Sequence, residues 1–371
     1  MAQLLPLPQN LIVWGENVLA STISAFPEHG IERPIVFSVD FLDAMRRDLV
    51  EPHLVGSVGN YLNLPAHAPD IAIEESLERI RSLGARSIIA HGGGSVLDAA
   101  KAASHLHHER TGTFLPIAAL PTTLSGSEFS HYFGITETNG PVRFKRSYAV
   151  RETVPTIVVL DPLLLLDTPV ELLLSSAIKG MDHAVEGMRT VDVDHPHAIM
   201  AASGLNQFAA VLERWPRGLP PRLAIESGAV THRDLLSLQL AAWHCYFAPA
   251  SVIYGLSHRI GHILGGTYGL PHSVTSCITL APVIRACADR YGPKLSIFGE
   301  SRIAPAAAQL ANRIEGLVTA QGLPDRVGPL GLDRSILPDV HDLLVRSYPA
   351  EVADLGDAAE AKLTSLLDSL W

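Results

Sequence analysis

Three histidines lie within one short segment of the chain. His258 and His262 are four residues apart, and His272 follows a Gly-Gly pair and a proline. On a helix, this four-residue spacing places two imidazoles on one face, one turn apart. The glycines and the proline interrupt such a helix, so the chain can return His272 to the same cavity. Three convergent imidazoles can bind a divalent metal, relay protons or bind an anionic substrate.

A second pair with helical spacing is Lys179 and His183, and Asp182 and Glu186 lie in the same predicted helix. The pair fits a substrate site and, equally, a solvent-facing lysine beside a packed histidine. The two acids can simply form salt bridges within the helix. Because the chain has 17 histidines, pairs at this spacing also arise by chance. The three histidines around a glycine break are therefore the stronger signal of function.

A run of three glycines lies in residues 91–101, after a predicted strand and at the start of a predicted helix. Glycines let the backbone approach a phosphate closely, and the helix N-terminus offers N–H groups and a positive dipole end. We expect Gly93, Gly94 and Ser95 to bind phosphate there. The alternative is an ordinary turn in which Ser95 caps the helix, with Asp98 near the capping-box position. The segment is not a G-x-G-x-x-G fingerprint.

Hydroxyl side chains follow the next predicted strand. Thr122, Thr123 and Ser125 suit the pyrophosphate or ribose of a cofactor, although such residues also fill many ordinary turns. Asp40 ends the first predicted strand, where a carboxylate can accept hydrogen bonds from ribose hydroxyls and repel a 2′-phosphate. A helix N-cap explains Asp40 equally well from local sequence.

Composition restricts the class of protein. The 371 residues are 47% hydrophobic and 18% charged, which indicates a folded protein of two domains. A net charge of −10 without a basic stripe argues against nucleic acid and anionic membranes as partners. No segment is long enough to span a bilayer, and the N-terminus does not resemble a signal peptide. Three cysteines without a CxxC motif predict free thiols in the cytoplasm.

Strand and helix patterns alternate through the first half of the chain. The predicted strands are 34–39, 53–58, 87–90, 114–120 and 156–160, and the predicted helices are 41–50, 71–83 and 96–105. This order predicts a mainly parallel sheet with helices on both faces. Asn139-Gly140 predicts a hairpin between 132–135 and 142–144. After Asp161-Pro162 only helical patterns follow. We therefore predict an α/β domain over 1–165 and an all-helical domain over 166–371, with the cleft between them as the default site.

Together these segments resemble the iron-containing alcohol dehydrogenase superfamily, which includes glycerol dehydrogenase and dehydroquinate synthase. The resemblance runs essentially end to end. Its most specific parts are GGGSVLDAAK at 92–101, the Asp161-Pro162 junction, His-Ala-Val-Glu at 183–186 and the H-x3-H-x9-H set. It implies a dehydroquinate synthase-like fold, with an α/β nucleotide-binding domain and an all-α domain. It also implies hydride transfer between a nicotinamide cofactor and a carbonyl or alcohol.

In metal-dependent members of the superfamily, an aspartate and three histidines hold iron or zinc. The histidines match His183, His258 and His272, but the aspartate position, four residues before the first histidine, is Lys179 here. Asp182 is rotated about 100° around the helix from His183. An ammonium in a metal site would repel a dication. This departure predicts an enzyme without a bound metal.

Within the superfamily the chain resembles the maleylacetate reductases, which lack that aspartate and work without metal. The hydroxyl loop TTLSGSE at 122–128 is one residue shorter than the form typical of the metal enzymes, and HILGGTYGLPH at 262–272 also resembles this branch. Two residues depart from it. Lys179 stands where the branch usually has asparagine, and Asp40 is more like the NAD-selective alcohol dehydrogenases.

The resemblance therefore implies a cytoplasmic, homodimeric, metal-independent reductase of aromatic compound catabolism that prefers NADH over NADPH. Its substrate would be a small anionic acid with a carbonyl or activated double bond. The residues expected at the cofactor are Asp40, Gly93, Gly94, Ser95, Asp98, Thr122, Thr123, Ser125 and Lys145. The residues expected to hold and polarise the substrate are Lys179, His183, His258 and His272, with His262 as proton relay. Arg259 either adds positive charge or faces solvent. The alternatives are a metal-dependent alcohol dehydrogenase with a relocated ligand and a degenerate nucleotide-binding regulatory protein.

Overall fold

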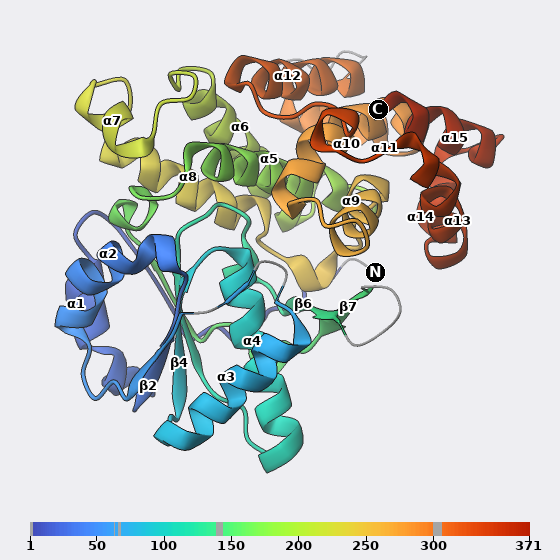
Figure 1. Cartoon of the computed structure of the whole chain (residues 1–371). Coiled ribbons are helices and arrows are strands. Elements are labelled where there is room, and N and C mark those ends of the chain that lie inside the picture. Colours follow the sequence, from blue (N-terminus) through green and yellow to red (C-terminus); the bar gives the residue numbers. More distant parts are fainter. Residues whose placement is uncertain (1–2, 63, 66–67, 139–143, 300–305) are drawn as a thin grey trace. The chain divides into compact units, whose positions relative to one another are not determined.

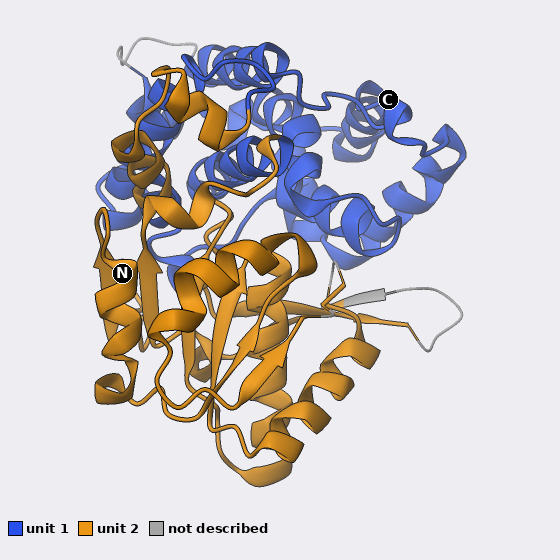
Figure 2. Ribbon diagram, turned by 60° about the vertical axis from the view of Figure 1, so that its left-hand side comes forward, with its two compact units in different colours: residues 1–4, 171–219, 241–371 blue, residues 5–170, 220–240 orange. Residues whose placement is uncertain are grey.

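The computed structural model describes residues 3–62, 64–65, 68–138, 144–299 and 306–371 (Figure 1). They form two compact units (Figure 2). The sheet unit comprises 5–170 and 220–240, and the helical unit comprises 1–4, 171–219 and 241–371. The sequence patterns divide the chain once, after residue 165. The compact units divide five residues later, after residue 170. The helical unit also includes residues 1–4, and the sheet unit also includes residues 220–240.

The sheet unit contains a six-stranded parallel sheet. Its strand order is β1 (Leu11–Trp14), β8 (Ile157–Leu160), β5 (Ile117–Pro121), β4 (Ser87–Gly92), β2 (Pro34–Phe37) and β3 (Gly59–Tyr61). Every residue of the four central strands is buried, as expected where helices cover both faces of a parallel sheet. Figure 1 shows α1 (Leu19–Ser24) and α2 (Asp43–Met45) on one side of β2 and β4. The helices α3 (Asp70–Leu83) and α4 (Gly94–Thr111) lie on the other side. The predicted sheet and its helical layers are confirmed.

Two strands differ from the sequence prediction. The predicted strand 53–58 is wrong, because Gly56 adopts φ +68°, which interrupts an extended chain, and β3 begins only at Gly59. The short edge strand β1 was not predicted from the sequence, although Leu11 pairs in register with Ile157. The predicted helix 41–50 exists as a continuous but irregular run of 3₁₀ turn, α2 and π turn over 40–50.

A separate two-stranded sheet is formed by β6 (Tyr132–Glu137) and β7 (Phe144–Ala149). The strands are antiparallel, with Tyr132 opposite Ala149 and Glu137 opposite Phe144. This pairing confirms the predicted hairpin strands. The predicted turn at Asn139-Gly140 lies outside the described residues.

Beyond β8 the described residues contain no strand. The longer helices are α5 (Val170–Gly187), α6 (Pro196–Leu212), α8 (His232–Cys245), α9 (Leu256–Gly266), α10 (His272–Ala286), α12 (Ala306–Gln321), α13 (Leu337–Ser347) and α15 (Ala359–Ser369). The shorter ones are α7 (Pro221–Glu226), α11 (Ala288–Tyr291) and α14 (Pro349–Val352). Within the helical unit α5 is buried on all sides from Leu173 to Gly187, so it forms the centre of that unit. Among the described helices, none combines the length and the apolar content that a membrane span requires.

Candidate active site

The glycine loop joins β4 to α4 in the sheet unit. The helix begins at Gly94, its N-cap is Gly93, and no side chain caps it. The alternative in which Ser95 caps the helix is therefore wrong, because Ser95 lies inside the first turn. The positive end of an 18-residue helix is thus not covered by a capping carboxylate or hydroxyl. Such a helix end is suited to a phosphate.

Two of the three glycines allow the loop after β4 to pack against the loop after β5. A Cβ atom on Gly93 would lie 2.7 Å from Cγ2 of Thr123, and one on Gly94 would lie 3.3 Å from Oγ of Ser125. Larger residues would push the two loops apart. The structure therefore brings together Gly93, Gly94, Thr123 and Ser125, four of the residues predicted for cofactor binding.

Two hydroxyls in the second loop lack a protein partner. Oγ1 of Thr122 and Oγ of Ser125 are buried and make no hydrogen bond within the part of the chain that the structure describes. Buried polar atoms nearly always have partners. Beside an uncapped helix N-terminus, these hydroxyls fit the phosphates or ribose of a nucleotide, so the residues present fit a dinucleotide cofactor.

Strand order places this loop at the ligand-binding edge of the sheet. The chain runs from β2 to β3 on one side, and from β4 to β5 on the other, so the order reverses between β2 and β4. Open α/β sheets bind ligands at this point, beyond the carboxyl ends of the strands. Asp40 follows β2 there, is exposed, and lies in a turn whose N-cap is Val39. The alternative of Asp40 as an N-cap is therefore wrong.

Asp98 has partners within the protein. Its Oδ1 accepts a hydrogen bond from Oγ of Ser127 at 3.1 Å, and its Oδ2 accepts from N–H of Gly134 at 3.2 Å. Nζ of Lys101 donates to the carbonyl oxygens of Ser127 and Tyr132 at 2.6 and 3.0 Å. These bonds tie the hydroxyl loop to α4. They give both carboxylate oxygens of Asp98 a protein partner, and its predicted place at the cofactor stays a prediction.

Lys101 and Glu128 were not predicted as site residues. Both are buried, and burial raises the pKa of Glu128 to about 7 and lowers the pKa of Lys101 to about 8. The signal available in the sequence was a lysine in an otherwise apolar stretch of α4. The side chain of Lys145, predicted near the ribose or nicotinamide, lies outside the described part of the structure.

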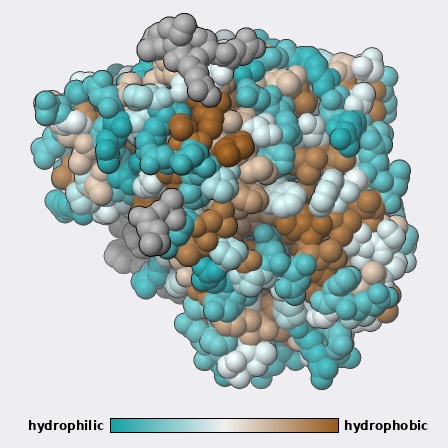
Figure 3. Space-filling model, turned by 180° about the vertical axis from the view of Figure 1, so that it is seen from behind, coloured by the Kyte–Doolittle hydropathy of each residue, from teal (hydrophilic) through white to brown (hydrophobic). Residues whose placement is uncertain are grey.

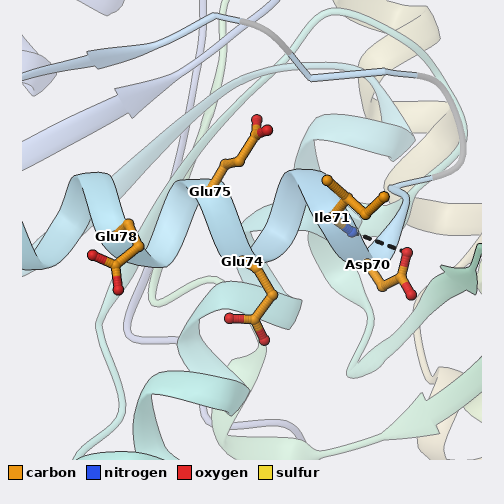
Figure 4. A pocket seen from close by; sticks show the side chains of 5 residues that line it. All are labelled: Asp70, Ile71, Glu74, Glu75 and Glu78. Carbon is orange, nitrogen blue, oxygen red and sulfur yellow. Dashed lines mark hydrogen bonds between the residues drawn. The ribbon is translucent and has the colours of Figure 1, made fainter. Parts of the chain in front are cut away.

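A surface hollow along α3 offers a different candidate (Figure 4). It is lined by Asp70, Ile71, Glu74, Glu75 and Glu78. Their partners are Thr138 for Asp70, Arg110 for Glu74, Tyr61 for Glu75 and Arg81 for Glu78. These carboxylates already have protein partners, so we assign the hollow no catalytic role.

The helical unit brings all the predicted histidines together. The helix α9 carries His258 and His262 and ends at Gly266, and α10 begins at His272. The ring centroid of His258 lies 4.6 Å from that of His262, 5.7 Å from that of His272 and 5.4 Å from that of His183. The predicted helix break at the Gly-Gly pair is thus confirmed, and after it the chain brings His272 next to His258 and His262.

Lys179 lies inside this cluster. Its side chain is 3% exposed, which excludes the solvent-facing alternative. Nζ donates to Oδ2 of Asp182 at 2.8 Å and to Nδ1 of His258 at 2.9 Å. Asp182 also accepts from Oγ of Ser276 at 2.7 Å. Although Asp182 is rotated away from His183, it is only about 60° around the helix from Lys179, which brings it into the network.

The lysine determines which nitrogen of His258 carries the proton. An ammonium can only donate, so Nδ1 of His258 must accept, and the neutral ring then carries its hydrogen on Nε2. Burial first, and then the charge of Lys179, lower the pKa of His258 and of His183 well below the usual value. Both rings are therefore neutral near pH 7, and His258 presents an N–H donor at Nε2.

This arrangement does not fit a bound dication. His258, His262 and His272 each place a nitrogen within 4.8 Å of the others, a spacing that a metal could use. However, Nδ1 of His258 already accepts from Lys179, and Nε2 carries its proton, so neither nitrogen offers a lone pair. The ammonium of Lys179 also stands beside the imidazoles where the resemblance requires an aspartate.

Two tyrosines that the sequence did not single out complete the walls of the cluster. Tyr246 stacks on His183 with ring centroids 4.0 Å apart, and Tyr254 stacks on His258 at 4.9 Å. Both tyrosines are buried, so they help to exclude water from the imidazoles. No motif or spacing marks them, because the contact depends on the loop after α8 meeting α5 and α9.

Arg259 does not contribute charge to the histidine cluster. Its Nε donates to Oε1 of Glu351 at 2.9 Å, and its guanidinium lies 4.9 Å above the ring of Tyr348. The side chain is 22% exposed. Its charge is therefore taken up by a structural ion pair.

Known proteins resemble this chain in sequence. Residues 9–162 match the family model described as Iron-containing alcohol dehydrogenase. The chain is 29% identical to the maleylacetate reductase of Pseudomonas aeruginosa over 342 residues, 91% of this chain and 90% of that one. These matches identify an oxidoreductase that is similar to the iron-containing alcohol dehydrogenases over residues 9–162 and to maleylacetate reductases over nearly its full length.

Solved structures show the same fold. The crystal structure of maleylacetate reductase from Rhizobium sp. strain MTP-10005 matches with a TM-score of 0.80 at 22% identity, covering 100% of this chain and 98% of that one. The structure of sulfoacetaldehyde reductase from Bifidobacterium kashiwanohense in complex with NAD+ also gives a TM-score of 0.80, at 18% identity and with the same coverage of both chains. The predicted two-part fold, an α/β part and an all-α part, is thereby shown.

Proposed function

We propose that this protein is a metal-independent, NADH-preferring reductase of the maleylacetate reductase type. Its substrate would be a small acid with an oxo group or an activated double bond. The observation that carries the proposal is the ammonium of Lys179, hydrogen-bonded to Asp182 and His258 where the metal enzymes of the family bind a cation. The names of the maleylacetate reductases that the chain resembles support the substrate class.

The sheet unit would hold the cofactor. Gly93 and Gly94 leave room for a pyrophosphate at the N-terminus of α4, and Thr122 and Ser125 offer hydroxyls that lack a protein partner. Asp40 would accept hydrogen bonds from the adenosine ribose. The NAD+ complex of sulfoacetaldehyde reductase supports a nicotinamide cofactor for this fold. When bound, the nicotinamide supplies the hydride that reduces the substrate carbon.

The helical unit would stabilise the charge that develops on the substrate oxygen. An ammonium has three N–H donors, and described residues accept two of those of Lys179. The third would donate to the substrate oxygen, together with Nε2–H of His258. Donors that are already fixed in a dry site stabilise an oxyanion strongly, because they need no reorganisation during the reaction.

His262 would return the proton. Its ring lies 4.6 Å from that of His258, and it is half-buried, whereas His258 is 8% exposed. As His258 gives its Nε2 proton to the substrate oxygen, the ammonium of Lys179 would pass a proton to Nδ1, so the ring stays neutral. His262 would then return a proton to the Lys179–His258 pair. General acid–base groups with this role contribute about 10²–10⁴-fold to turnover.

The proposed reaction can be tested by NADH oxidation. Purified protein is assayed with maleylacetate, with other oxo acids and with neutral aldehydes of similar size. We expect turnover with the oxo acids and much weaker turnover with the neutral aldehydes. Preference for a neutral aldehyde, or no turnover with any acid, would overturn the proposed substrate class.

We also propose a homodimer. Trp14, Phe41 and Val55 of the sheet unit are 52, 52 and 54% exposed. Apolar residues gather in patches on the face shown in Figure 3. Exposed apolar patches are typical of association surfaces. Light scattering on the purified protein separates a dimer from a monomer, and a monomer at assay concentration contradicts the proposal.

A further inference from the structure

A buried acidic side chain from α5 meets the first turn of α9, and burial raises its pKa to about 8. Glu186 is 0% exposed, and its Oε2 accepts a hydrogen bond from the backbone N–H of His258 at 3.2 Å. Its Oε1 accepts from the hydroxyl of Tyr291 at 3.1 Å. Gly255, the N-cap of α9, provides no side-chain cap of its own. The carboxyl group thus does for α9, from another helix, what a capping side chain normally does locally.

Gly255 is the counterpart of this cap. A Cβ atom at residue 255 would lie 2.9 Å from both carboxyl oxygens of Glu186. The backbone of Gly255 has φ −97°, which any residue can adopt, so only the carboxyl group requires a glycine here. The pair Glu186–Gly255 therefore determines how closely the start of α9 approaches α5.

The consequence for the site follows from what the two helices carry. Lys179 lies two turns before Glu186 on α5. Its hydrogen bond to Nδ1 of His258 forms only if α9 keeps a fixed rotation about its own axis and a fixed position along α5. The backbone N–H that donates to Glu186 also belongs to His258. The side chain and the main chain of this histidine are thus each held by one residue of α5.

We propose that Glu186 is a positioning residue for the reaction, which acts through the N-terminus of α9 and needs Gly255 in order to do so. It keeps His258 in contact with Lys179 and so keeps Nε2–H directed as a donor. It does not touch the substrate. This inference rests on the proposed function for its effect on turnover, but not for its effect on His258.

The test uses two substitutions that act on one contact. Glu186→Ala removes the acceptor, and Gly255→Ala pushes the carboxyl group out of hydrogen-bonding position. We expect each to lower kcat for the oxo acid by about 10–100-fold, the cost of small misplacements of catalytic groups. NADH affinity, measured by fluorescence titration, should stay within twofold. Glu186→Gln keeps an acceptor of the same shape and should recover kcat to within about fivefold of the parent.

A double-mutant cycle shows whether the effect passes through this contact. In the Glu186→Ala background the added Cβ at residue 255 meets no carboxyl group, so Gly255→Ala should cost less than twofold there. The matched control is Gly316→Ala on the exposed face of α12, where a Cβ has nothing within 4 Å. If Gly255→Ala costs as much in both backgrounds, or as little as Gly316→Ala, the inference is overturned.

Histidine NMR supplies a readout that does not depend on activity. In ¹⁵N-histidine-labelled protein, His258 should show the Nε2–H tautomer, and Gly255→Ala should shift that signal while Gly316→Ala leaves it unchanged. An unchanged His258 signal in Gly255→Ala overturns the positioning role even if the parent reduces no oxo acid. Conversely, a parent without oxo-acid activity but with the expected NMR shifts contradicts only the proposed function. If Glu186→Ala does not fold, Gly255→Ala and Glu186→Gln still decide the question.

Discussion

Replacing Lys179 should separate its structural role from its catalytic one. Lys179→Met keeps the length of the side chain and removes its charge. Among the described residues, the 0% exposed carboxylate of Asp182 then keeps the hydroxyl of Ser276 as its hydrogen-bond donor. Breaking one partner of a buried ion pair costs about 3–5 kcal/mol, because the remaining charge stays buried and uncompensated. We therefore expect a loss of this size in the free energy of unfolding, measured by urea denaturation.

The double variant Lys179→Met with Asp182→Asn resolves the two roles. It removes both charges while preserving shape, so most of the lost stability should return. Activity should not return, because the donor to the substrate oxygen is still missing. Loss of one preorganised oxyanion donor costs about 10²–10³-fold in kcat. NADH oxidation with the oxo acid measures this, with NADH affinity as the control.

One result would refute the reasoning on Lys179. If the double variant is as stable as the parent and keeps kcat within threefold, then the ammonium contributes only to folding. Catalysis would in that case depend on the histidines alone. If the double variant regains neither stability nor activity, the charge balance between Lys179 and Asp182 is not what holds the cluster together.

Four further predictions follow from the same structure. Dialysis against EDTA should leave activity within twofold, and Lys179→Asp should gain affinity for Zn²⁺ in a calorimetric titration; loss of parent activity that zinc or iron restores would favour a metal enzyme. Asp40→Asn should lower the preference for NADH over NADPH by about 10–100-fold, because the repulsion of a 2′-phosphate is lost, and a parent that uses both equally would contradict this placement. His262→Ala should lower kcat by about 10²–10⁴-fold with little change in KM, and turnover within a few-fold of the parent would rule out the relay. Burial lowers the pKa of His91 from 6.5 to about 4. Between these pH values the unfolded chain binds more protons than the folded one, so the free energy of unfolding must fall as the pH falls. His91→Phe should recover up to about 3 kcal/mol of this loss at pH 4.5 relative to pH 7.5, and equal pH slopes of the unfolding free energy for variant and parent would contradict this.

Local patterns predicted the framework well. The alternation of buried runs and helical periods predicted a parallel sheet, and the Gly-Gly pair after His262 predicted the end of α9. Such features depend on a few consecutive residues and their backbone preferences. They fail where one residue changes the local conformation, as Gly56 does before β3, or where a strand is short and lies at an edge, as β1 does.

By itself, then, the sequence determined the order of the elements, the spacing of the histidines and the presence of a lysine at the place of a metal-ligand aspartate. Only the tertiary structure decided the chemistry of that lysine. Its contacts with Asp182 and His258 fix a tautomer and remove the lone pairs that a metal needs. The cap that Glu186 provides to α9, the walls formed by Tyr246 and Tyr254, and the hydrogen bonds of Asp98 were likewise invisible in the sequence. Each joins residues distant along the chain, and such contacts arise from packing between elements, whereas periodicity records only what neighbouring residues prefer.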